Sequence, residues 1–164
     1  EREALAFGTH VAVMEGGRIE QEGETATLIS RPRSATVARL IGGWNVLDYR
    51  LSITGSLSSD EEVLLTCAAP RDGLARGTTS QLIGFPIARV TTDNAVQGHA
   101  RGTEVVKIAA TVLRVQSWYD TKQVVTKIES GRIITATIVG PTALGAGQPV
   151  TLVIGKDDIH AFQD

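Results

Sequence analysis

The sequence EVVKIAATVLRVQSWYDTKQVVTKIESGRIITATIV, at residues 104–139, carries the clearest strand pattern in the chain. It contains three apolar runs, and in the last of them Ile134, Ala136 and Ile138 alternate with threonines. A period of two places these three side chains on one face of a strand and the threonines on the other. Because turn residues separate the runs, the stretch predicts consecutive antiparallel strands.

The same texture continues over the rest of residues 44–164, where short apolar runs are bounded by Gly, Asp, Ser and Pro. We expect a strand in each of these runs, which are NVLDYRLSIT (45–54), EEVLLTC (61–67), SQLIGF (80–85), IARVTT (87–92) and QPVTLVIG (148–155). In the run before Trp118, the set of alternate residues that contains Leu113 and Val115 is more apolar than the other set. Repeated short strands without long helices between them predict a mainly β fold, an antiparallel barrel or a sandwich.

Residues 1–43 have a different pattern, typical of a small α+β unit. A helix end is stopped by Gly8, and an apolar run of the kind found in buried strands follows at 10–14. Gly16-Gly17 then predicts a hairpin turn into a second strand. Two short helices come next, with Thr25 and Ser34 as the expected N-caps. We therefore divide the chain into units 1–43 and 44–164.

The composition argues against several classes of protein. The 164 residues include 16 Lys and Arg against 18 Asp and Glu, for a net charge of −2. Neither this charge nor the few aromatics, two Trp, two Tyr and three Phe, fits a nucleic-acid binder that neutralises phosphates and stacks bases. The single cysteine, Cys67, excludes an intrachain disulfide and a cysteine-based metal cage. No apolar run approaches the roughly 20 residues that a membrane-spanning helix needs.

The sequence contains no recognisable set of catalytic residues. The chain has no GxxxxGK[ST] phosphate loop, and its three histidines lie in separate segments outside any HExxH motif. We therefore predict no catalytic, cofactor-binding or metal-binding residue. Exposed aromatics and polar turn residues are the remaining candidates for a ligand site or an interface. They are Trp44, Asn45, Thr78, Thr79, Trp118, Tyr119 and Lys122.

A family pattern gives more information. The first 47 residues, EREALAFGTHVAVMEGGRIEQEGETATLISRPRSATVARLIGGWNVL, resemble the C-terminal edge of the ATPase domain of importer-class ABC transporters. In that family a helix, a strand, a hairpin and two further helices follow the switch histidine in this order. The matching positions are Glu3-Ala4-Leu5, Val11-Ala12-Val13-Met14, Gly17-Arg18-Ile19, Gln21, Gly23, Pro32, Val37-Ala38-Arg39, Ile41-Gly42 and Asn45.

The remainder resembles the β-domain appended to such subunits, the OB-like TOBE domain. The similarity lies in the rhythm of the strands after residue 108, in a turn carrying Leu144, Gly147 and Val150, and in the final Asp-Asp-Ile-x-x-Phe. The fold class expected from the resemblance is an OB-like or TOBE β-barrel or sandwich, preceded by a small α+β remnant of an ABC ATPase domain.

The resemblance implies that an intact protein would bind ATP and Mg²⁺ at a dimer interface and couple ATP hydrolysis to solute uptake. The family's phosphate loop, signature motif, Walker B acid and switch histidine would all precede residue 1, so none of its catalytic residues can be assigned to this chain. The resemblance also implies a cytoplasmic protein, peripheral to the cell membrane, that contacts membrane subunits.

We therefore expect a C-terminal regulatory region that binds without catalysis. Its expected partners are a second copy through the β-region, and a regulator protein or the transported solute. The runs GTTSQ (77–81) and DTKQ (120–123) could supply the hydroxyl, amine and backbone groups of an oxyanion site. The alternative is a stand-alone OB-type domain for single-stranded nucleic acid or a small ligand, although the charge balance makes nucleic acid an unexpected partner.

Overall fold

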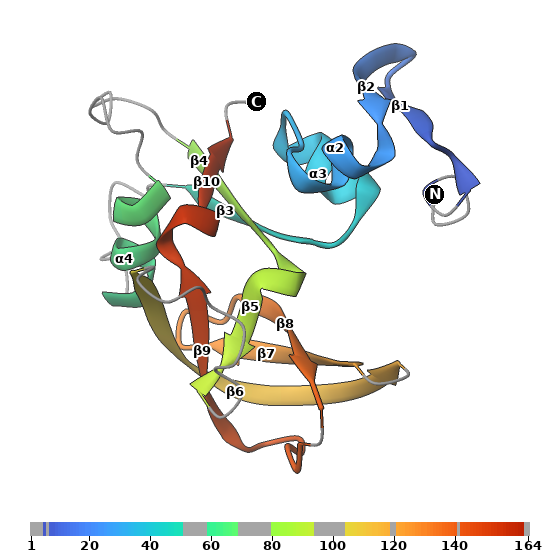
Figure 1. The fold of residues 1–164 in the computed structure, drawn as a ribbon. Helices are drawn as coiled ribbons and strands as arrows, with labels where there is room; N and C mark the ends of the chain where they lie inside the picture. The colour runs from blue at the N-terminus through green and yellow to red at the C-terminus, as the bar shows by residue number, and fades with distance from the viewer. Residues whose placement is uncertain are drawn as a thin grey trace.

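A computed structural model describes Leu5, Phe7 and residues 8–50, 59–68, 80–93, 104–118, 121–140 and 142–162 (Figure 1). The N-terminal elements are β1 (His10–Glu15), β2 (Arg18–Glu24), α2 (Thr25–Ser30) and α3 (Ala35–Ile41). The elements that follow are β3 (Trp44–Arg50), α4 (Ser59–Ala68), β4 (Ser80–Pro86), the 3₁₀ turn η1 (Ile87–Arg89), β5 (Val90–Thr92), β6 (Val105–Trp118), β7 (Thr121–Ile128), β8 (Ile133–Val139), β9 (Pro149–Gly155), the 3₁₀ turn η3 (Lys156–Asp158) and β10 (His160–Phe162).

A five-stranded antiparallel sheet, in the order β5-β9-β6-β7-β8, forms the body of the fold. Its first and last strands, β5 and β8, also lie against each other, so the sheet curls into a nearly closed barrel. The expected mainly β, OB-like class is therefore confirmed. The alternation predicted for β8 holds, since Ile134, Ala136 and Ile138 are buried and the threonines between them are half-buried.

A second sheet of three strands, in the order β10-β4-β3, is joined to the barrel by two chain segments of the same form. One segment runs from β4 through η1 into β5, and the other runs from β9 through η3 into β10. The residues before the two 3₁₀ turns, Pro86 and Gly155, have φ and ψ of −64°, 135° and −66°, 135°. β4 pairs with β10 and β5 pairs with β9, so the segments cross as a pseudo-symmetric pair.

One hydrophobic core extends across the barrel and the small sheet. Tyr49 of β3 and Phe85 of β4 are its largest fully buried side chains. They pack with the barrel's inward side chains and with Leu64 and Leu65 of α4. Since the aromatic anchors come from the small sheet and the aliphatic residues mostly from the barrel, the two sheets stabilise each other.

The N-terminal unit lies to one side of the barrel in Figure 1 and packs on the small sheet. Ser34 caps α3 as predicted, since its hydroxyl accepts a hydrogen bond of 3.2 Å from the N–H of Val37. The buried residues of α3 pack with Trp44 and Phe162. Gly16 and Gly17 have φ of 56° and 79°, which is typical of the predicted tight hairpin turn.

Four sequence-based expectations for local structure are wrong in whole or in part. In the run IARVTT (87–92), Ile87–Arg89 form the 3₁₀ turn η1, and only Val90–Thr92 form a strand. The run EEVLLTC (61–67) is not a strand but the body of helix α4, whose acidic first turn favours a helix. The N-cap of α2 is Glu24 instead of Thr25, which is the first helical residue and donates its hydroxyl to Gly8 O. The strand at 10–14 forms as β1, but it is not buried, because Met14 is 57% exposed on a two-stranded sheet.

The face of β6 also changes along its length. The pairing with β7 shifts between Val112 and Arg114, so Leu113 is the extra residue of a β-bulge. Val112 is therefore buried and Leu113 is 44% exposed, which is the reverse of the expected pattern. Of the two residues expected on the apolar face, only Val115 is half-buried. Beyond a bulge, the alternate residues that faced the core face outward, and the others turn inward. The sequence pattern alone does not reveal where a bulge occurs.

The ring of Phe162 in β10 covers Gly84 in β4. A Cβ added there would lie 3.0 Å from Cζ of Phe162 and closer still to its Cε2. We therefore expect Gly84→Ala to lower the free energy of unfolding by about 1–3 kcal/mol through overpacking. Urea unfolding monitored by tryptophan fluorescence measures this change.

Gly145 provides the matched control for this substitution, because a Cβ there meets no atom within 4 Å and its backbone is not left-handed. Gly145→Ala should leave the unfolding midpoint nearly unchanged. Adding Phe162→Leu to the Gly84→Ala variant should recover part of the loss. Equal midpoints for the two alanine variants would contradict this account of the packing.

Candidate functional site

Trp44, one of the predicted ligand or interface residues, is buried in the folded chain. Its indole is 8% exposed, and Nε1 donates a hydrogen bond of 2.8 Å to the carbonyl oxygen of Ile29 in α2. The ring lies 5.5 Å from that of His160 and 6.0 Å from that of Phe162, both in β10. Trp44 therefore connects the N-terminal helices to the small sheet.

Asn45, the next residue, connects the small sheet to the barrel. Its Nδ2 donates to the carbonyl oxygen of Thr135 at 2.9 Å, and its Oδ1 accepts from the N–H of Thr135 at 2.8 Å. Because β8 is the last strand of its sheet, these backbone groups have no further strand to pair with. The carboxamide of Asn45 thus takes the place of one residue of a neighbouring strand.

The other predicted site residues are not brought together by the described structure. Thr78, Thr79 and Tyr119 lie outside the described residues. Trp118 ends β6, but its side chain is outside the description too. Lys122 of β7 donates from Nζ to the carbonyl oxygen of Thr142 at 3.0 Å, across the turn that follows β8. Their predicted role in a ligand site or an interface stays a prediction.

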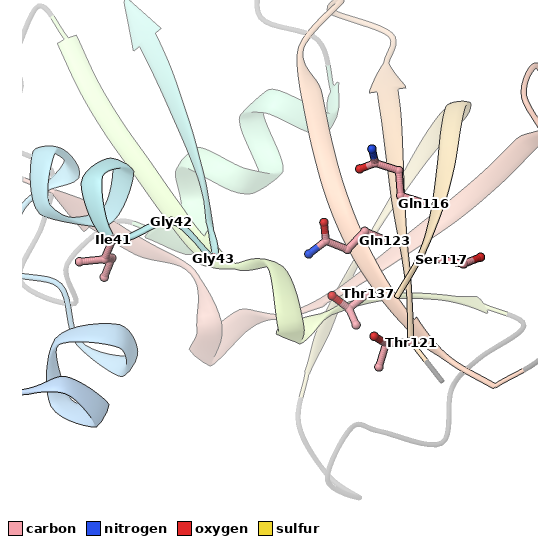
Figure 2. A pocket seen from close by; sticks show the side chains of 8 residues that line it. All are labelled: Ile41, Gly42, Gly43, Gln116, Ser117, Thr121, Gln123 and Thr137. Atoms are coloured by element: carbon pink, nitrogen blue, oxygen red, sulfur yellow. The ribbon is translucent and has the colours of Figure 1, made fainter. Parts of the chain in front are cut away.

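A large pocket lies between the α3–β3 link and the strands β6, β7 and β8 (Figure 2). Its volume is about 850 Å³, within the usual range for small-molecule sites. The barrel side contributes hydroxyl and carboxamide side chains, and the opposite side is the short link between helix and strand. The described lining residues are Ile41, Gly42, Gly43, Gln116, Ser117, Thr121, Gln123 and Thr137.

Three of the lining side chains form a row across three strands. Gln116 of β6 is directly opposite Gln123 of β7, which in turn is directly opposite Thr137 of β8. Directly opposite residues have Cβ atoms about 5 Å apart, so the row is about 10 Å long. In Figure 2 the carboxamides of Gln116 and Gln123 point toward the α3–β3 link, while the hydroxyl of Ser117 points the other way.

The opposite wall of the pocket is backbone. Gly42 ends α3 with φ of 68°, and Gly43 follows with φ of 78°, so both residues adopt a left-handed conformation that favours glycine. The carbonyl oxygen of Gly43 accepts a hydrogen bond of 2.8 Å from the N–H of Ile87 in η1. The link is therefore fixed to the crossing segment that enters the barrel.

The sequence alone does not predict this pocket. It predicts a possible oxyanion site at DTKQ (120–123), and Thr121 and Gln123 of that run do line the pocket. Its Lys122 is not among the described lining residues. The sequence signal for the pocket is that Gln116 and Gln123 are polar residues of two adjacent strands. They can be recognised as neighbours only when the strand register is known.

Within the described part of the chain, no group of three or more His, Cys, Asp or Glu side chains could hold a metal ion. No helix within the described ranges has the length and apolar character needed to cross a bilayer.

Comparison with known proteins gives a partial match. No family model matches the chain. The chain is 31% identical over 87 residues to the spermidine/putrescine import ATP-binding protein PotA of Oleidesulfovibrio alaskensis. The aligned part covers 53% of this chain and 19% of that protein, so the chain spans about a fifth of its relative. The predicted resemblance to an importer ATP-binding subunit is confirmed over this stretch.

A solved structure is also similar in part. The cytoplasmic molybdate-binding protein ModG, crystallised with molybdate bound, superposes with a TM-score of 0.44 at 13% identity. The superposition covers 52% of this chain and 62% of ModG. At this level of similarity we draw no argument from it.

The Asn45–Thr135 contact generates a prediction about pH. In Asn45→Asp a carboxylate faces the Thr135 carbonyl oxygen, which raises the pKa of the new side chain in the folded state above its unfolded value of about 3.9. The variant should be less stable than the parent by about 1–3 kcal/mol at neutral pH. The loss should shrink as the pH falls toward 4, because a protonated carboxyl group can donate as the amide does.

Urea unfolding of the parent and the variant at several pH values measures this difference. Asn45→Ala is the control, since it loses both hydrogen bonds of the carboxamide without adding a titrating group. Its loss of stability should not depend on pH. A loss in Asn45→Asp that stays constant between pH 4 and pH 7, roughly the range in which the carboxyl titrates, would contradict the assigned geometry.

Proposed function

We propose that this chain is the C-terminal regulatory region of the ATP-binding subunit of an ABC importer. The observation that carries the proposal is the 87-residue match to an importer ATP-binding protein. The order of elements supports it, because a hairpin and two short helices precede a mainly β region, as in the family pattern of the first 47 residues.

In this proposal the β-region is a TOBE-type domain and acts by binding alone. ATP and Mg²⁺ would be bound by the ATPase domain of an intact subunit, whose phosphate loop, signature motif and Walker B acid this sequence lacks. The regulatory logic is linkage: a ligand or protein that prefers one arrangement of the subunits shifts the ATPase cycle by its differential affinity.

The proposed partners follow from the same assignment. An intact subunit would lie at the cytoplasmic side of the membrane and contact the importer's membrane subunits. The name of the relative makes polyamines the first solutes to test for transport. A regulator protein or the transported solute would be the ligand of the β-region.

The reading frame that precedes residue 1 tests this proposal directly. We expect it to encode a phosphate loop, a signature motif and a switch histidine shortly before Glu1. The purified chain should show no ATP turnover, because it lacks the groups that hold the phosphates and the metal ion. ATP turnover by the chain itself, or an open frame without these motifs, would refute the proposal.

We also propose that the chain forms a homodimer through the β-region. Val139, the last residue of β8, is an apolar side chain that is 71% exposed. Burying such a side chain against a second copy of the chain is favourable. Analytical ultracentrifugation at tens of micromolar should therefore detect a dimer, and Val139→Lys should shift it toward monomer.

Val63→Lys is the matched control for this charge substitution. Val63 is also an exposed valine, but it lies on helix α4 and not on the barrel sheet. The control variant should keep the dimer. A monomeric parent chain at these concentrations would disprove the homodimer proposal without affecting the assignment as an importer subunit.

A further inference from the structure

The pocket between the α3–β3 link and the barrel has an unusual lining. Its described lining residues carry hydroxyl, carboxamide, backbone and one aliphatic group, and none of them is charged. Within the described part of the chain, the side chains of Gln116, Gln123 and Thr137 make no hydrogen bond to other groups. The pocket therefore presents a row of donors and acceptors that the described part of the chain does not use.

We propose that this pocket binds a neutral polyhydroxylated small molecule, of the sugar or polyol class, through Gln116, Gln123 and Thr137. A hydroxyl group of such a ligand both donates and accepts, as do the carboxamides and the threonine hydroxyl that face it. The row is about 10 Å long, so several ligand hydroxyls can be bound at once. The volume of about 850 Å³ accommodates a mono- or disaccharide.

The absence of charge among the described lining residues selects against ionic ligands. A polyamine or an oxyanion entering the pocket would lose part of its hydration and meet no opposite charge from the described lining. A neutral polyol loses only hydrogen bonds to water, which the carboxamides and the hydroxyl replace. This distinguishes the pocket from a site for the polyamines named in the description of PotA.

The position of the pocket gives its occupancy a structural consequence. One wall is the link Gly42-Gly43, which joins α3 to β3, and the other wall belongs to three strands of the barrel. A ligand that contacts both walls would hold the N-terminal unit in one orientation relative to the barrel. The binding site is independent of the proposed function, and only the regulatory use of this orientation depends on it.

Calorimetric titration of the purified chain tests the site. The neutral probes are glucose, sucrose, trehalose and mannitol, and the ionic comparison ligands are spermidine and sulfate. We expect saturable heat from at least one neutral probe at micromolar to millimolar concentrations, and none from the ionic ligands. In ¹H–¹⁵N spectra the same probe should shift the side-chain amides of Gln116 and Gln123 and the backbone amides of Gly42 and Gly43.

Two nearly isosteric variants test the assigned residues. Gln123→Met and Thr137→Val each remove hydrogen-bonding groups while keeping the shape of the side chain, and each should weaken binding about threefold to tenfold. Thr111→Val is the control, because Thr111 is an exposed residue of β6 outside the pocket. Its affinity should equal that of the parent. Thermal unfolding shows whether each variant is folded. If one of the two pocket variants does not fold, the other is sufficient to test the assigned site.

Three results would overturn the proposal. The first is the absence of saturable binding by every neutral probe to the folded chain. The second is binding that Gln123→Met and Thr137→Val leave unchanged, which places the ligand elsewhere. The third is binding by spermidine or sulfate alone. None of these results would bear on the assignment to an importer subunit, which the preceding reading frame tests separately.

Discussion

The pairing of the Asn45 carboxamide with the backbone of Thr135 joins the two sheets by two hydrogen bonds. It connects residues 90 positions apart, and it satisfies both the N–H and the carbonyl oxygen of an edge residue. A single side chain can do this because a carboxamide carries a donor and an acceptor in nearly the geometry of a peptide group. The neighbouring Trp44 then fixes the N-terminal helices to the same strand, so consecutive residues hold three parts of the chain together.

The crossing of the two strand–3₁₀–strand segments imposes a second constraint on the fold. The residues that follow the 3₁₀ turns, Val90 and Ile159, have φ and ψ of −94°, 121° and −93°, 119°, so the segments leave their turns alike. An ion pair of 4.0 Å between Arg89 and Asp158 links the two turns at the surface. Because each segment supplies a strand to both sheets, neither sheet can shift without moving the other.

Much of the fold could be predicted from local patterns, and the exceptions have specific physical causes. The threonine alternation in β8 and the turn at Gly16-Gly17 are local signals, and both were interpreted correctly. The run EEVLLTC (61–67) is ambiguous, because a short apolar run fits a strand as well as one face of a helix. The bulge at Leu113 depends on pairing with β7, which the composition of β6 alone does not specify.

The candidate site could not be predicted for a related reason. Trp44 and Asn45 were singled out as conspicuous polar or aromatic residues, and their partners, Ile29 and Thr135, are distant in sequence. The row in the pocket consists of ordinary surface residues, Gln116, Gln123 and Thr137, which become a group only through the register of three strands. Residue type suggested where chemistry could occur, but only the tertiary structure indicates which side chains act together.

The position of β9 in the sheet has a consequence for how the chain is made. β9 lies between β5 and β6, and its residues, Pro149–Gly155, are synthesised after every other strand of the five-stranded sheet. Until they emerge from the ribosome, β5 has no partner strand in the barrel and β6 is paired on one side only. The hairpins of β6, β7 and β8 can form early because their contacts are local, whereas closure of the barrel must wait for β9. Until β9 is available, the edges of β5 and β6 that it pairs with stay exposed.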